Sequence, residues 1–217
     1  MLAAAVLTIV TGAIFASMIR SQNAYNQGVS QLRIQEESNR IMGEIVEFIR
    51  SSKVVSVADN GCVITLQKPV DYDGDGDVIN TDWEVEYGYN WGGTEYLDAT
   101  CQIVFEMTGN KSETGLSSDL NKDGDMADVY SSGVLRKRYL DSNGVLQEEI
   151  TFSGDLIFVG DVDGNGTVEP MFQRVDHGGF IQADGRCILA MFMVMNVAPD
   201  GYPHVLDLAT IITPRNQ

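Results

Sequence analysis

The first nineteen residues of the chain form an unbroken apolar run. They read MLAAAVLTIVTGAIFASMI, and Arg20 is the first charged residue. As a helix this run is about 28 Å long, close to the thickness of the hydrocarbon core of a bilayer. A secretory signal peptide fits poorly because no basic n-region is present, and a helix apolar on all sides is hard to bury in one small domain. The pattern predicts a helix that inserts into a membrane or into the core of an assembly.

The helix is expected to continue to about residue 55. Between Ser21 and Lys53 there is no proline. Apolar residues recur mostly at helical spacing, at Val29, Leu32, Ile41, Ile45, Phe48 and Ile49. The chain is thus divided into a long N-terminal helix (1–55), of which residues 1–19 are the bare part, and a globular domain (56–217).

From residue 56 onward the pattern changes to short apolar or alternating runs. These runs predict strands at residues 62–67, 83–89, 102–107, 133–140, 145–152, 187–197 and 205–213. The Ser142-Asn143-Gly144 segment indicates a hairpin turn between two of them. Strands joined by loops rich in Gly, Asp and Asn favour a largely antiparallel sheet. Together with the helix they predict an α+β fold.

The net charge belongs almost entirely to the predicted sheet domain. The chain of 217 residues carries a formal charge of −17, yet residues 1–68 hold five acids and six bases. The acidity after residue 68 argues against nucleic acid as a partner, because a polyanion repels an acidic surface.

Three loops in this acidic domain share one spacing. In the first, acids occupy positions 1, 3, 5 and 12 of a twelve-residue loop, with glycine at position 6 and a backbone carbonyl expected from position 7. The residues are Asp71, Asp73, Asp75, Asp77 and Asp82. Alternate carboxylates converge on one hard cation, and glycine permits the sharp turn. The loop departs from the usual calcium loop in having Asp, not Glu, at position 12.

The other two loops are shortened variants of the same spacing. In the second, position 12 is Tyr130, so Asp128 is expected to close the site; its ligands are Asp119, Asn121, Asp123, Asp125 and Asp128. The third ends on an acid at position 9; its ligands are Asp161, Asp163, Asn165, Thr167 and Glu169. Clusters of Asp, Asn and Gly also make ordinary polar turns. Three loops with the same 1-3-5-6 spacing favour calcium, and magnesium fits less well because it prefers octahedral sites with several waters.

Other chemistry has little support in the sequence. Cys62, Cys101 and Cys187 allow three single bridges, of which Cys62–Cys101 is preferred, and three buried free thiols are the alternative. No catalytic motif for a nucleophile, a metalloprotease or a phosphate-binding loop occurs, so no catalytic residue is assigned. Aromatic residues between positions 83 and 96 suit either sheet packing or a surface that binds a glycan or another adhesive target.

The apolar run, the polar SQNAYNQ after it and the amphipathic stretch up to RSSKVV resemble type IV pilins and pseudopilins, most closely the larger minor pilins. The LATIITPRNQ segment at residues 208–217 is also similar to the end of such minor pilins. The chain lacks the opening residues of the mature N-terminus of that family, including a glutamate. The resemblance implies a pilin-like fold, insertion in the cytoplasmic membrane before assembly, and an extracellular filament with the helices at its centre. Small residues would allow the helices to approach closely, at Ala3, Ala4, Ala5, Gly12, Ala13, Ala16 and Ser17.

The sequence therefore predicts a structural, non-enzymatic subunit of a type IV pilus-like filament, with a calcium-stabilised globular domain and copies of itself as partners. Two alternatives stay open. One is a minor pilin or type II secretion pseudopilin that primes or caps a filament. The other is a membrane-anchored calcium-dependent binding protein or enzyme.

Overall fold

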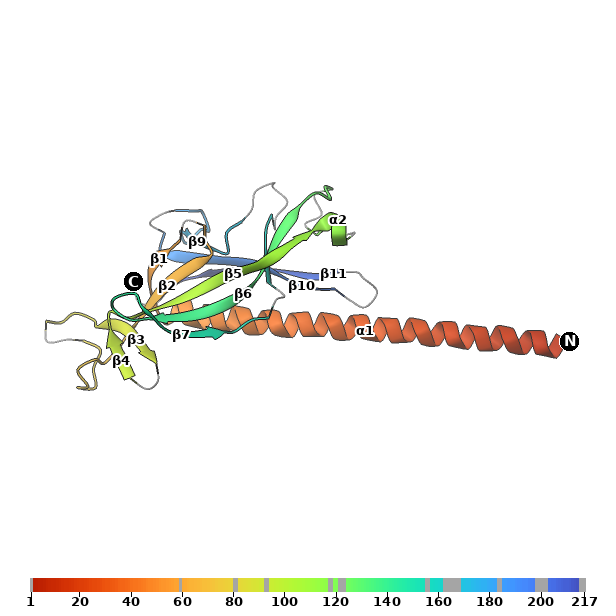
Figure 1. Cartoon of the computed structure of the whole chain (residues 1–217), viewed down its shortest axis with the longest axis horizontal. Coiled ribbons are helices and arrows are strands. Elements are labelled where there is room, and N and C mark those ends of the chain that lie inside the picture. Colours follow the sequence, from red (N-terminus) through yellow and green to blue (C-terminus); the bar gives the residue numbers. More distant parts are fainter. Residues whose placement is uncertain are drawn as a thin grey trace.

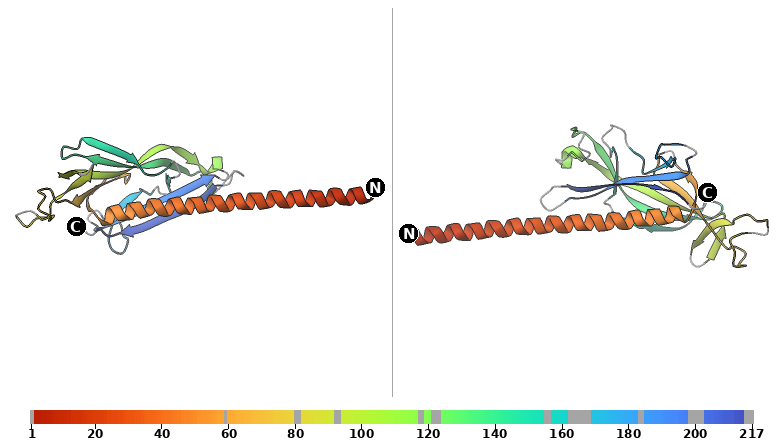
Figure 2. Two further views of the ribbon diagram at one scale, coloured as in Figure 1. Left: turned by 90° about the horizontal axis from the view of Figure 1, so that it is seen from below. Right: turned by 180° about the vertical axis from the view of Figure 1, so that it is seen from behind.

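A single long helix, α1 (Leu2–Arg50), forms the N-terminal part of the chain. The computed structural model describes residues 2–58, 60–79, 82–91, 94–116, 119–120, 124–154, 157–161, 169–182, 185–197 and 203–214. At about 1.5 Å per residue, α1 is about 74 Å long. Its C-terminal part lies along one face of a sheet, and its N-terminal part projects beyond the sheet, as all the ribbon views show (Figure 1, Figure 2).

The packed part of α1 begins at Ser30. The buried positions recur every three or four residues, as a helix with one covered face requires, at Ser30, Ile34, Ser38, Ile41, Ile45 and Ile49. Asn196 Nδ2 donates to Ser30 Oγ at 3.2 Å and fixes the point where the sheet ends along the helix. We call residues 2–29 the projecting half of α1 and residues 30–50 its packed half.

The helix ends at Arg50, before the expected boundary at residue 55. Ser52 Oγ donates to the Phe48 carbonyl at 2.6 Å, and this bond satisfies one of the last carbonyls of the helix. The β-branched pair Val54-Val55 follows inside a strand. Valine favours strands over helices, which explains the early end of α1. Among the described residues, no helix combines the length and the apolar character needed to cross a membrane.

The rest of the described chain is mostly strand. The elements after α1 are β1 (Lys53–Val57), β2 (Val63–Pro69), β3 (Tyr87–Trp91), β4 (Thr94–Leu97), β5 (Thr100–Ser112), α2 (Glu113–Leu116), β6 (Val129–Leu140), β7 (Leu146–Thr151), β8 (Ile157–Val159), β9 (Phe172–Val175), β10 (Cys187–Val197) and β11 (Pro203–Ile212). The main strand order is β11-β10-β8-β6-β5-β2-β3-β4, while β1 pairs with β2, β7 with β6 and β9 with β10. Every pairing between described strands is antiparallel. The predicted α+β class with an antiparallel sheet is therefore confirmed.

The main core lies between the packed half of α1 and the face of the sheet that it covers. The isoleucines of α1 meet side chains from β2, β5, β6, β9, β10 and β11, among them Ile64, Leu66, Ile103, Leu135, Phe172, Phe192 and Ile212. Lys137 on β6 joins this layer through its ammonium, which lies 2.9 Å from Glu44 Oε2 and 3.8 Å from the centre of the Phe48 ring. The domain thus covers one half of the helix and leaves the other half bare.

Most predicted strands are present, with shifted ends. The strand 187–197 matches β10 in full, and the predicted turn before Gly144 joins β6 to β7, with a positive φ of 77° at this glycine. The strand expected at 83–89 is wrong over its first half, because Trp83 adopts a left-handed φ of 64° and β3 begins only at Tyr87. The short strands β1, β4, β8 and β9 and the helix α2 were not predicted.

Candidate functional sites

The first predicted loop brings three acids together. One carboxylate oxygen from each of Asp71, Asp73 and Asp75 lies within 4.8 Å of the other two. The Gly76 amide donates to Asp71 Oδ2 at 2.9 Å, and the φ angles of Gly74 and Gly76 are 74° and 91°. Residues with a side chain rarely adopt such angles, so glycine is needed for this curl. The loop therefore directs alternate carboxylates to one point, as a hard cation requires.

The base of this loop is held by Glu86, which the sequence analysis did not assign. The Tyr72 amide donates to Glu86 Oε2 at 3.1 Å, and the backbone of Glu86 bonds to Val70 and Val78 at 3.0 and 2.8 Å. Ile79 also forms an isolated antiparallel bridge with Val85. Asp71 Oδ1 is buried at this base without a hydrogen-bond partner among the described residues. These bonds fix the first acid of the loop near the end of β2.

The remaining acids of the first loop lie outside the three-acid group. Asp77 Oδ1 accepts a hydrogen bond from the Val78 amide at 2.7 Å, so this carboxylate faces its own backbone. The prediction assigned only the backbone carbonyl of Asp77 to a cation. Asp82, the expected closing ligand, is exposed and is not part of the group. The structure thus assembles positions 1, 3 and 5 but not position 12.

The second loop repeats the geometry of the first at the positions that the structure describes. The Gly124 amide donates to Asp119 Oδ2 at 3.0 Å, and Gly124 has the same φ of 91° as Gly76. Asp125 Oδ1 accepts from the Ala127 amide at 2.9 Å. Asp128 is half-buried. The predicted ligands Asn121 and Asp123 lie outside the described residues.

The third loop is described only at its two ends. Asp161 and Glu169 are both buried, with 6% and 9% of their surfaces exposed. The Glu169 amide donates to the Gly160 carbonyl at 2.9 Å and brings the ends together. The predicted ligands Asp163, Asn165 and Thr167 lie outside the described residues. Of the five predicted ligands, the structure therefore describes two, the buried acids at the two ends of the loop.

Tyr130 connects the second and third loops. Its hydroxyl lies 3.2 Å from Glu113 Oε1 and 3.1 Å from the Asp161 carbonyl and donates toward both. Burial raises the pKa of Tyr130, and the negative charges of Glu113, Asp128 and Asp161 raise it further. The phenol therefore stays protonated and remains a donor at neutral pH. Glu113, like Glu86, was missed by the sequence analysis because it lies outside the loop spacing.

A different kind of surface covers the projecting half of α1. The large apolar side chains that the structure describes in this half face solvent, with exposed fractions of 68% for Leu7, 61% for Ile14 and 72% for Tyr25. A shallow apolar face lies on one side of this half, and its residues include Val10, Ala13, Ile14, Ser17, Met18 and Tyr25. An apolar surface of this extent on a charged protein is characteristic of an interaction surface.

The cysteines are free thiols, so the preferred Cys62–Cys101 bridge is wrong. Cys101 pairs with Leu66 across β2 and β5, four residues from Cys62 along the strand, or about 13 Å at the rise of a strand. This separation is too large for a disulfide. Burial raises the pKa of Cys101 to about 12, which keeps it unreactive. Cys187 is buried with its Sγ 3.4 Å from His177 Nδ1.

The aromatic residues between positions 83 and 96 divide between core and surface. Tyr89 is buried, and its ring centre lies 5.1 Å from that of Tyr139. Trp83 is 88% exposed, and Tyr96 is also exposed. Packing thus accounts for Tyr89 but not for Trp83, and the proposed glycan or adhesive target stays a prediction.

Comparison of the chain with protein-family models, with curated proteins and with solved structures gives no match.

Proposed function

We propose that this protein is a pilin-like structural subunit of an extracellular filament, assembled from copies of itself through the projecting half of α1. The main support for the proposal is the difference in solvent exposure between the two halves of α1. The packed half is covered by the sheet, whereas the projecting half exposes large apolar side chains on several sides. No described strand lies against these side chains, because this half of α1 projects beyond the sheet (Figure 2).

A second copy of the same helix suits this surface better than an unrelated partner. The projecting half carries one charged residue, Arg20, and no acid. Small residues such as Gly12, Ala13 and Ser17 allow two such helices to approach closely. The acidic domains repel one another and favour the outside of a filament, where salt and cations screen their charge. Central helices and peripheral domains follow from this distribution.

The same proposal assigns calcium to the three acidic loops. Two observations support this assignment. Three acids come together in the first loop, and in both the first and the second loop the glycine amide at position 6 donates a hydrogen bond to the aspartate at position 1. Bound calcium offsets the repulsion between carboxylates and lowers the net negative charge of each domain. Its role is structural, because no pair of long helices flanks any of the loops in the described residues.

In this proposal the apolar run resides in the cytoplasmic membrane before assembly and leaves it for the filament. A subunit that primes or caps a filament is the second candidate, since the resemblance is closest to the larger minor pilins. The two candidates differ in abundance, because a structural subunit is repeated along the filament and a capping subunit is confined to its tip.

The test is sedimentation and electron microscopy of the purified full chain after detergent removal, with calcium present. A structural subunit forms regular filaments that pellet, with the helices in the centre of the density. Species that stay small, and attach to liposomes through α1 without forming filaments, would contradict the proposal and support the membrane-anchored alternative. Short oligomers that extend only when another pilin is added would instead identify a priming subunit.

A further inference from the structure

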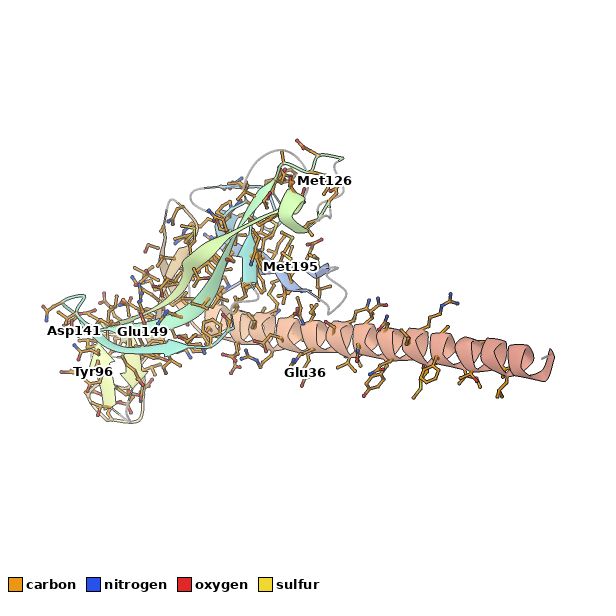
Figure 3. The ribbon with its side chains drawn as sticks, turned by 45° about the vertical axis from the view of Figure 1, so that its right-hand side comes forward. Glu36, Tyr96, Met126, Asp141, Glu149 and Met195 are labelled. Atoms are coloured by element: carbon orange, nitrogen blue, oxygen red, sulfur yellow. The ribbon has the colours of Figure 1, made fainter. Side chains whose placement is uncertain are left out.

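Glu113 is a buried acid for which the calcium-loop spacing provides no role. It is the first residue of α2, six positions before the second loop begins, and its side chain is fully buried. Figure 3 shows the short helix α2 beside Met126, which lies at the tip of the second loop. Thr114 Oγ1 donates to the Met126 carbonyl at 2.5 Å and ties the helix to that tip.

The carboxylate of Glu113 lies where the second loop closes. Glu113 Oε1 accepts hydrogen bonds from the Leu120 amide at 2.6 Å and from the Tyr130 hydroxyl at 3.2 Å. Leu120 and Tyr130 occupy positions 2 and 12 of the loop. The Glu113 amide also donates to the Asp128 carbonyl at 3.1 Å. One acid from outside the loop is thus bonded to its beginning and to its end.

The second oxygen of this carboxylate is unsatisfied. Glu113 Oε2 is buried and has no hydrogen-bond partner among the described residues, and no described lysine or arginine pairs with Glu113. A buried carboxylate oxygen that receives neither a hydrogen bond nor a cation is unfavourable. A cation bound in the loop would supply the partner that this oxygen lacks.

We propose that Glu113 is the closing ligand of the cation site in the second loop. In a full calcium loop, position 12 supplies a carboxylate, but here it is Tyr130. The tyrosine instead orients Glu113 by donating to its Oε1, and Oε2 is left to coordinate calcium. This inference rests on the proposed calcium binding and names a ligand that the loop spacing does not contain.

The test is a calcium titration by calorimetry of the full chain, in which the first loop has been disabled by Asp73→Asn and Asp75→Asn and the third by Asp163→Asn and Asn165→Ala. Into this background we introduce Glu113→Gln, whose amide oxygen still accepts the bonds from Leu120 and Tyr130. If Glu113 is a direct ligand, Glu113→Gln should reduce the calcium affinity of the second loop about tenfold or more. Luminescence of bound terbium, excited through tyrosine, gives a second readout, because Tyr130 is adjacent to the site.

Melting curves separate a ligand from a merely structural residue. For a ligand, Glu113→Gln lowers the melting temperature more in calcium than in EDTA, because only the calcium-bound state loses a bond to the cation. Glu113→Asp, which keeps the charge but retracts it, weakens binding as well. A shift that is equal in calcium and EDTA, or unchanged affinity in Glu113→Gln, overturns the inference. Calorimetry of the parent chain tests the proposed calcium sites separately from the role of Glu113. If the parent chain binds no calcium, the calcium sites themselves are refuted.

Discussion

The two halves of α1 have similar backbones and opposite surroundings. In the packed half, Ile41, Ile45 and Ile49 are fully buried against the sheet, while in the projecting half Ile14 is 61% exposed. Burial of one such side chain contributes about 1.5–3 kcal/mol. The packed half therefore stabilises the folded domain. The apolar side chains of the projecting half can gain a comparable free energy only when another copy or a membrane buries them. Stability and assembly should accordingly respond to different substitutions in one helix.

The largest effect is expected from a charge in the projecting half. Ile14→Glu places a carboxylate on the apolar face, and burying it between helices without a partner costs several kcal/mol. We expect filaments to be lost in the sedimentation assay, with the melting temperature of the domain unchanged. Asn39→Glu, on the exposed side of the packed half, is the matched control and should leave assembly intact. If Ile14→Glu assembled as well as the parent chain, the projecting half would not be the assembly surface.

A cavity in the packed half should lower the stability of the domain and leave assembly intact. Ile45→Ala removes a fully buried side chain from the main core, which costs about 2–5 kcal/mol. Chemical denaturation followed by circular dichroism measures this loss. A variant that still folds at low temperature should still assemble, since the projecting half is unchanged. If Ile45→Ala abolished assembly while the domain stayed folded, the two halves would not be separable.

Calcium should stabilise the domain that the packed half supports. Each occupied site adds about 2.7 kcal/mol when free calcium is a hundredfold above the dissociation constant. We therefore expect EDTA to lower the melting temperature of the parent chain. The response should shrink in Asp73→Asn with Asp75→Asn, and persist in Glu148→Gln, which removes an exposed acid outside the loops. Identical melting curves with calcium and with EDTA would contradict the calcium assignment.

The smallest effect is expected at the polar contact between the packed half and β6. Lys137→Met keeps the aliphatic stem but removes the ion pair with Glu44 and the ammonium over Phe48. Glu44 keeps a second partner, Arg40, at 2.8 Å, so the loss should be only about 1–2 kcal/mol. Denaturant titration measures it, with exposed Lys111→Met as the control. A loss as large as that of Ile45→Ala would mean that the ion pair, not the isoleucine face, governs the packing.

The sequence predicted the features that depend on short-range spacing. The helix, its apolar start and the long strands follow from periodicity. Gly76 and Gly124, at position 6 of their loops, have the left-handed conformation that the loop pattern requires. The features that were missed depend on contacts between distant residues. Glu86 and Glu113 reach the loops from outside the spacing. The short strands β8 and β9 both pair with β10, which is distant in the sequence, and β8 also pairs with β6. Trp83 was assigned to a strand because aromatic residues favour strands, but the turn that closes the first loop includes it.

Hydrogen exchange of the backbone amides in the projecting half tests the central claim most directly. The measurement compares detergent-free filaments of the parent chain with the monomeric Ile14→Glu variant, read by mass spectrometry over residues 7–29. The account predicts strong additional protection of this segment in filaments and little change over residues 30–50, which the sheet already covers. Filaments in which residues 7–29 exchange as fast as in the monomer would show that assembly uses another surface, and the proposed function would be wrong.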